Sequence, residues 1–182
     1  MPRYVAFLRA INVGSGRTIK MEVLRQSFEA LGLAQVETFG ASGNVVFETT
    51  VKNPRALEKR LERALRDLVG FAVGTFIRTD AEVAEIARYE PFQLPKTGGA
   101  AQMNIVFLAR PLDAESSRTV EGLRTDSDEF HVQGREIYWL RRRKPGGYDF
   151  RTVPLGRTLD QPFTIRGANT VNKLAAKFRC AV

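Results

Sequence analysis

Hydrophobic positions follow two different spacings along the first 80 residues, and the change of spacing marks the expected elements. Residues 4–11 (YVAFLRAI) are apolar at nearly every position, which is typical of a central strand covered on both faces. Residues 35–39 and 44–48 predict two further strands, joined by the hairpin signal GASG at 40–43. A fourth strand is expected at residues 71–78.

Two amphipathic helices separate these strands. The first begins near Ile19, and the residues of its apolar stripe are Met21, Leu24, Phe28 and Leu31. The second runs from Pro54 to Gly70, and its stripe consists of Leu57, Leu61, Leu65 and Leu68. The resulting order βαββαβ predicts an α+β fold in which residues 1–79 form a ferredoxin-like sandwich, with both helices on one face of an antiparallel sheet.

The remaining residues, 80–182, predict a second and smaller α+β subdomain. Asp80 is expected to cap a short helix, ahead of the main elements. Those elements are a strand at 103–109, a helix at 113–123, a hairpin of strands at 130–133 and 136–142, and a terminal helix at 169–178. This order, βαββα, echoes the first half and suggests a diverged structural duplication.

The sequence shows no membrane-spanning segment and no signal peptide. No apolar run approaches the roughly 20 residues that span a bilayer. The chain enters a strand pattern at once, which leaves no room for a signal peptide. Cys180 is the only cysteine, so no disulfide forms within the chain and a cytoplasmic location is expected. Residues 12–16 lack the spacing of known nucleotide-binding loops, and no cofactor is predicted.

Charge is distributed unevenly along the chain, which carries a net charge of +8. Residues 1–134 contain 17 Lys or Arg and 17 Asp or Glu, whereas residues 135–182 contain 11 and 3. All of the excess therefore lies in the last quarter, which favours an anionic partner such as nucleic acid or phosphate. The alternative is that an arginine-rich surface reflects the base composition of the genome and promotes solubility.

Several blocks of the sequence resemble a known bacterial family. They are residues 7–14 (FLRAINVG), residues 42–47 (SGNVVF), the tail at 164–166 with 170–174, and the residues Lys20, Met21 and Leu24. On these blocks the chain resembles the domain of unknown function 1697 family over essentially its whole length. The family usually has Asn-Trp after the tail arginine, where this chain has Gly167-Ala168, so a role for that pair is not carried over. The resemblance implies a ferredoxin-like N-terminal part and a bacterial cytosolic protein, without an established activity.

Sheet topology predicts a site at one edge of the first domain. The first two strands of a βαββαβ sheet run the same way, so the loops that follow them meet at one edge, beside the start of the first helix. A helix N-terminus attracts anions, and glycines let backbone approach a ligand closely. The predicted anion site comprises Arg9, Asn12, Gly14, Arg17, Lys20, Ser42, Gly43 and Asn44, and it includes Arg166 and Thr170 if the tail packs there. The alternative is that the glycines serve the turns and Arg9 pairs with a carboxylate.

A second candidate is a nucleic-acid surface near the second hairpin. Its residues are Trp139, Arg141, Arg142, Arg143 and Lys144, which offer an aromatic ring for stacking and cations for phosphates. Strand alternation places Trp139 and Arg141 on one face. The third strand holds only Phe47 where RNA-recognition modules place several aromatics, which argues against base stacking on that sheet.

Other polar residues have simpler interpretations. His131 is the only histidine, which excludes a histidine metal cluster, and it is interpreted as a solvated strand residue. Glu58 and Glu62 are interpreted as surface partners of nearby cations. Asp126, Asp128 and Glu129 offer oxygen ligands for a hard cation such as Mg²⁺ or Ca²⁺, but they are interpreted as residues of a solvated loop before a strand.

Three functional hypotheses follow from the sequence. The first is a protein that binds an anionic ligand: a nucleotide, a phosphate metabolite or a nucleic-acid backbone. The second is an enzyme acting on a phosphorylated or carboxylated small molecule at the same site. The third is an interaction module that works as a homodimer. No catalytic constellation is recognised in the sequence, and no metal site is predicted.

Overall fold

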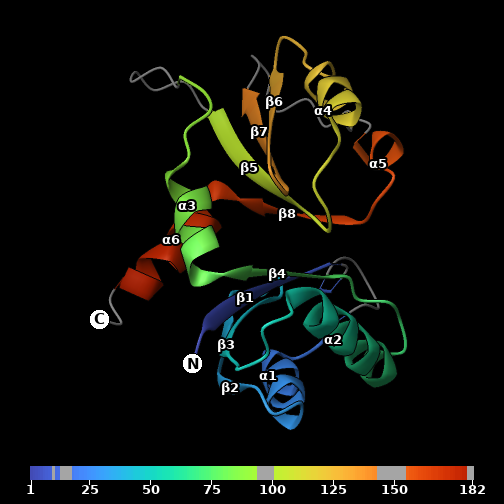
Figure 1. Cartoon of the computed structure of the whole chain (residues 1–182), viewed down its shortest axis with the longest axis vertical. Helices are drawn as coiled ribbons and strands as arrows, with labels where there is room; N and C mark the ends of the chain where they lie inside the picture. Colours follow the sequence, from blue (N-terminus) through green and yellow to red (C-terminus); the bar gives the residue numbers. More distant parts are fainter. Residues whose placement is uncertain (10, 13–17, 94–100, 143–154, 180–182) are drawn as a thin grey trace. The chain divides into compact units, whose positions relative to one another are not determined.

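The computed structural model describes residues 1–9, 11–12, 18–93, 101–142 and 155–179. Contacts divide the chain into two compact units, Met1–Glu85 with Leu174–Val182 and Ile86–Lys173. Each unit contains one four-stranded antiparallel sheet, so the fold is mixed α+β (Figure 1). No helix among the described residues is long and apolar enough to cross a membrane.

The first unit has the element order that its hydrophobic pattern predicts. The elements are β1 (Arg3–Leu8), α1 (Met21–Ala30), β2 (Ala34–Phe39), β3 (Asn44–Glu48), α2 (Pro54–Val69) and β4 (Thr75–Thr79). The strands lie in the order β2-β3-β1-β4, and neighbouring strands are antiparallel. Helices α1 and α2 lie on the same side of this sheet (Figure 1).

One hydrophobic core joins the helices to the sheet. Leu24 and Phe28 of α1, together with the leucines of α2, pack against alternate strand residues such as Ala6, Leu8 and Phe47. The predicted stripes are confirmed except at Leu68, which is 47% exposed. In the last turn of α2, Val69 packs against the core instead.

The ends of the helices follow ordinary capping chemistry. Helix α2 begins after Asn53, whose side chain accepts a hydrogen bond from the Ala56 N–H, and ends at Gly70 in the left-handed conformation (φ 77°). Helix α3 (Asp80–Arg88) begins with a capping box: Thr79 Oγ1 accepts from the Glu82 N–H, and Glu82 Oε2 accepts from the Thr79 N–H. The prediction that Asp80 caps this helix is therefore wrong.

The second unit contains more elements than the sequence predicts. They are β5 (Ala101–Leu108), α4 (Ala114–Glu121), β6 (Asp128–Gln133), β7 (Glu136–Arg142), α5 (Leu155–Thr158) and β8 (Phe163–Gly167). Helix α6 (Ala168–Arg179) follows, and its residues from Leu174 onward group with the first unit. The strand order is β6-β7-β5-β8. The prediction βαββα misses α5 and β8. In β8 the usual alternation is inverted, because Ile165 is exposed while Arg166 is buried.

The central strands of the two sheets match at several positions. The Leu8 N–H donates to the Gly43 carbonyl (2.8 Å), and the Leu108 N–H donates to the Arg135 carbonyl (2.9 Å) at the equivalent place. Val5 pairs with Arg78, as Ile105 pairs with Arg166. Both buried arginines donate from Nη1 to the carbonyl of the preceding isoleucine. These correspondences support the structural duplication that the sequence suggests.

Candidate functional site

The loop after β1 and the β2–β3 turn lie side by side, as the topology argument requires. The Leu8 N–H donates to the Gly43 carbonyl (2.8 Å), and Asn12 Nδ2 donates to the Ala41 carbonyl (2.8 Å). Asn12 Oδ1 also accepts from the Ile19 N–H (2.9 Å), just before α1. One asparagine therefore joins the first loop, the turn and the approach to the helix.

Most polar groups at this junction are bonded within the protein. Asn44 is fully buried, and its Nδ2 donates to the Phe39 carbonyl (2.8 Å) and to Ser42 Oγ (3.1 Å). Gly43 has a φ of +74°, and a Cβ there would lie 2.4 Å from Ile11 Cδ1. The side-chain amides of Asn12 and Asn44 bond to carbonyls of the turn, and Gly43 leaves space for the buried Ile11 side chain. These contacts favour a structural role for Asn12, Gly43 and Asn44.

The charged members of the predicted site have different settings. Arg9 is exposed, and its backbone N–H donates to the Gly74 carbonyl (2.7 Å). Lys20 is the exposed N-cap of α1 and makes no side-chain capping bond. Glu22 in the first turn already brings negative charge to this helix start, and it is paired with Arg25. Gly14 and Arg17 lie outside the described residues.

The tail residues of the predicted site belong to the second unit. Arg166 is buried, and its Nη1 donates to Thr164 Oγ1 (2.9 Å). Burial lowers the pKa of its guanidinium to about 10, because the charged form loses hydration. Thr170 is partly exposed on α6. That these two residues belong to the anion site stays a prediction.

A basic groove, which the sequence analysis missed, lies in the first unit. It has a volume of about 370 Å³ and is lined by residues 72–74 together with Lys59, Glu62, Arg63 and Arg66 of α2. These helix residues recur at spacings of three and four, so they share one face. Within the described part of the chain, the side chains of Lys59 and Arg63 form no ion pair or hydrogen bond, and the Arg66 side chain pairs only with Asp67, at 3.7 Å. This spacing is a sequence signal for one basic face of α2, and the structure adds the hollow beside residues 72–74.

Glu58 and Glu62 of α2 bond to the backbone of β4, whereas the sequence interpretation made them surface partners of cations. Glu62 Oε1 accepts from the Thr75 N–H (2.9 Å), and Glu58 Oε1 accepts from the Ile77 N–H (2.8 Å). Because β4 is an edge strand, these N–H groups have no neighbouring strand to pair with. The two glutamates accept hydrogen bonds from the N–H groups at the free edge of β4. The Glu62 carboxylate, which lines the groove, is therefore already hydrogen-bonded to the Thr75 N–H.

Replacing Glu58 by alanine should lower the free energy of unfolding by about 1–3 kcal/mol, because the buried Ile77 N–H loses its acceptor. Urea denaturation of the full chain measures this change. Glu85→Ala, at an exposed position of α3, serves as the control and should stay within about 0.5 kcal/mol of the parent. Equal effects of the two substitutions would show that the carboxylate does not protect the edge strand.

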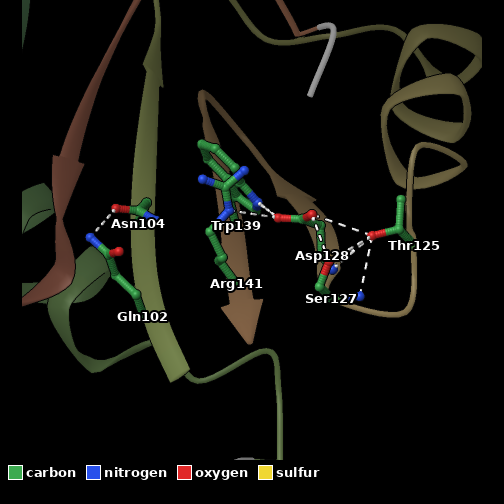
Figure 2. A network of polar contacts seen from close by, with 7 residues as sticks. All are labelled: Gln102, Asn104, Thr125, Ser127, Asp128, Trp139 and Arg141. Atoms are coloured by element: carbon green, nitrogen blue, oxygen red, sulfur yellow. Dashed lines mark hydrogen bonds and ion pairs between the residues drawn. The ribbon is translucent and has the colours of Figure 1, made fainter. Parts of the chain in front are cut away.

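The second candidate region is a closed polar network, shown in Figure 2. Asp128 is buried, and its Oδ1 accepts from Trp139 Nε1 (2.7 Å) and from Arg141 Nε (3.0 Å). Its Oδ2 accepts from the hydroxyls of Thr125 and Ser127, each at 3.3 Å. The interpretation of Asp128 as a solvated loop residue is therefore wrong. No group of three or more His, Cys, Asp or Glu side chains among the described residues is arranged to hold a metal ion.

The described side chains that are predicted to bind nucleic acid already have partners within the protein. The Arg141 guanidinium lies 4.5 Å from the centroid of the Trp139 ring, and the ring also stacks on Phe130 (5.8 Å). Arg142 is paired with Glu129 at 2.6 Å. Arg143 and Lys144 lie outside the described residues. The geometry gives these described cations and this ring roles within the protein, and binding of nucleic acid stays a prediction.

Comparisons with other proteins agree with this architecture. A sequence model described as a protein of unknown function, DUF1697, matches residues 1–138. No curated protein matches the sequence. A solved structure of a conserved bacterial protein from Streptococcus pneumoniae superposes with a TM-score of 0.72 at 23% identity, covering 98% of this chain and 99% of that one. At this identity the likeness concerns the fold alone.

Proposed function

The chain belongs to the DUF1697 family of proteins of unknown function, and from this premise we propose that it binds an anionic ligand in the basic groove of its first unit. The observation that carries the proposal is the placement of Lys59, Arg63 and Arg66 around one hollow. Convergent cations raise the local concentration of anions and hold them by charge-assisted hydrogen bonds.

The size of the groove favours a small ligand over a nucleic-acid backbone. Its volume of about 370 Å³ lies at the lower end of the range of roughly 300–1,000 Å³ found for small-molecule pockets. Gly74 at the groove wall lies beside Arg9, since a Cβ there would be 3.4 Å from Arg9 Cβ. The groove therefore adjoins, at Arg9, the sheet edge where the sequence predicts an anion site. A phosphate metabolite or a nucleotide is the class of ligand that suits it.

Two finer points of the sequence analysis are part of this proposal. The ferredoxin-like arrangement predicted for residues 1–79 is supported by the strand order β2-β3-β1-β4 of the first unit, with its antiparallel pairing. A cytoplasmic location is supported by the single cysteine of the chain, Cys180.

Isothermal titration with inorganic phosphate and with ATP tests the proposal, with Arg63→Gln and Lys52→Gln as a matched pair. Both variants lose one positive charge in the first unit, but only Arg63 lines the groove. We expect Arg63→Gln to weaken binding about tenfold or more, equivalent to about 1.4 kcal/mol, and Lys52→Gln to change it little.

The salt dependence of binding separates the ligand classes. A small ligand in the groove should lose little affinity between 50 and 200 mM salt, whereas a nucleic-acid backbone should lose about 10³-fold or more. Equal weakening by Arg63→Gln and Lys52→Gln, or the absence of saturable binding by either anion, would overturn the proposed site.

A further inference from the structure

Three side chains of the second unit form a connected chain of acid–base groups. Tyr89 Oη lies 2.8 Å from His131 Nε2. On the other side of the imidazole, His131 Nδ1 lies 3.6 Å from Glu121 Oε1. Tyr89 follows α3, His131 lies on β6, and Glu121 is the last residue of α4. His131 lies on a strand and is partly exposed, as the sequence indicates, but both of its ring nitrogens face a partner.

Packing and hydrogen bonds hold this arrangement in place. Glu121 Oε1 accepts from the Val132 N–H (2.9 Å), which fixes the carboxylate at the outer edge of β6. The Tyr89 ring stacks on the imidazole (5.7 Å) and packs against the ring of Tyr138 (5.0 Å). Tyr138 is buried, and its hydroxyl donates to the Ile86 carbonyl (3.3 Å).

Only one of the two neighbouring tyrosines is available for reaction. Burial and the neighbouring charges raise the pKa of the Tyr138 hydroxyl far above its usual value, so this hydroxyl stays protonated. Tyr89 is 38% exposed, so a molecule from solvent can reach its hydroxyl. The imidazole and the carboxylate are accessible to a similar degree, 36% and 41%.

This order of groups is the pattern of an activated nucleophile. A hydroxyl within hydrogen-bond reach of an imidazole can transfer its proton there, and an acidic group on the far side orients the imidazole and stabilises the imidazolium. We propose that Tyr89 is a nucleophile that accepts an acyl group from an activated carboxylic ester, with His131 as general base and Glu121 as the positioning residue.

In the proposed step, Tyr89 Oη attacks the carbonyl carbon of the ester and forms a new C–O bond. The hydroxyl proton passes to His131 Nε2, and the bond between the acyl carbon and the leaving alkoxide breaks. The alkoxide then takes the proton from His131 and departs as an alcohol, which leaves an ester on Tyr89 and a neutral imidazole.

The charges at the site favour an acyl donor over a phosphoryl donor. Among the described residues, no lysine or arginine is bonded to Tyr89, His131 or Glu121. Glu121 would repel a phosphoryl donor, which carries several negative charges, whereas a neutral ester is not repelled. This site is separate from the basic groove and does not depend on it.

Two measurements on the full chain test the proposal. The first is the tautomer of His131, which gives a single set of imidazole signals in ¹⁵N NMR because the chain has one histidine. We expect the neutral ring to carry its proton on Nδ1, so that Nε2 accepts from Tyr89. A proton on Nε2 would exclude His131 as the base, whatever the variants show.

The second measurement is acylation by p-nitrophenyl acetate, located by peptide mass spectrometry. Tyr89 should react about tenfold or more faster than N-acetyltyrosine amide, because a positioned base contributes roughly 10²–10⁴-fold in well-formed sites. His131→Gln should remove this excess, and Glu121→Gln, which keeps an acceptor for the Val132 N–H, should reduce it. Arg88→Gln, an exposed neighbour, is the control and should leave it unchanged. Acylation of Tyr89 at the rate of the reference compound, or an equal loss in the control, would refute the role.

Discussion

Replacing Asp128 by alanine is expected to lower the free energy of unfolding by about 3–5 kcal/mol, because it removes one partner of a buried ion pair. The carboxylate accepts from Trp139 Nε1 and Arg141 Nε, and the Arg141 side chain is only 15% exposed. Without Asp128, both partly buried donors lose their carboxylate, and the hydroxyls of Thr125 and Ser127 lose the same acceptor.

The adjacent residue provides a control on the same strand. Glu129 is paired with Arg142, but both side chains are well exposed, so Glu129→Ala should cost at most about 1 kcal/mol. Fluorescence of Trp139, the only tryptophan, follows the second unit during urea denaturation. Equal shifts of the two midpoints would mean that the network around Asp128 is as well hydrated as the surface pair.

The second large effect is expected for Gly43→Ala, at about 2–5 kcal/mol. A left-handed backbone costs a non-glycine residue about 1–2 kcal/mol, and overpacking typically costs about 1–3 kcal/mol more. The added Cβ would lie 2.4 Å from Ile11 Cδ1 and 3.1 Å from Leu8 Cβ, so a buried side chain has to move.

Gly40 in the same turn separates the two causes. Its φ is +67°, but no atom lies within 4 Å of an added Cβ, so Gly40→Ala should show the backbone cost alone. Shortening Ile11 to alanine should then recover part of the loss in Gly43→Ala, which a double-mutant cycle by urea denaturation measures. If Gly40→Ala and Gly43→Ala cost the same, contact with Ile11 does not explain the glycine.

The sequence predicts the first unit better than the second, for a physical reason. Leu24, Phe28 and the leucines of α2 face one core at regular spacing, so periodicity alone identifies the helices. In β8 the buried position is Arg166 and the exposed one is Ile165, so burial contradicts polarity and no hydrophobic pattern marks the strand. The strand conformation of residues 163–167 therefore depends on tertiary contacts and not on a local pattern.

The candidate sites show the same limit. Strand direction is enough to place the loop after β1 beside the β2–β3 turn, but not to show that Asn12 and Asn44 are occupied by backbone carbonyls. Likewise, Tyr89 and His131 are 42 residues apart. The pairing of β6 with β7 sets His131 opposite Tyr138, on whose ring Tyr89 packs. Side-chain partners of this kind depend on long-range contacts that local spacing does not record.

The proposal of an anion groove is tested most directly by NMR titration of the full chain with phosphate, read at assigned backbone amides. We expect saturable shifts at Arg63, Arg66 and Gly74, which line the groove, and much smaller ones at Lys20 and Glu22 at the start of α1. Shifts that rise linearly with phosphate everywhere, or that saturate only at the start of α1, would contradict it.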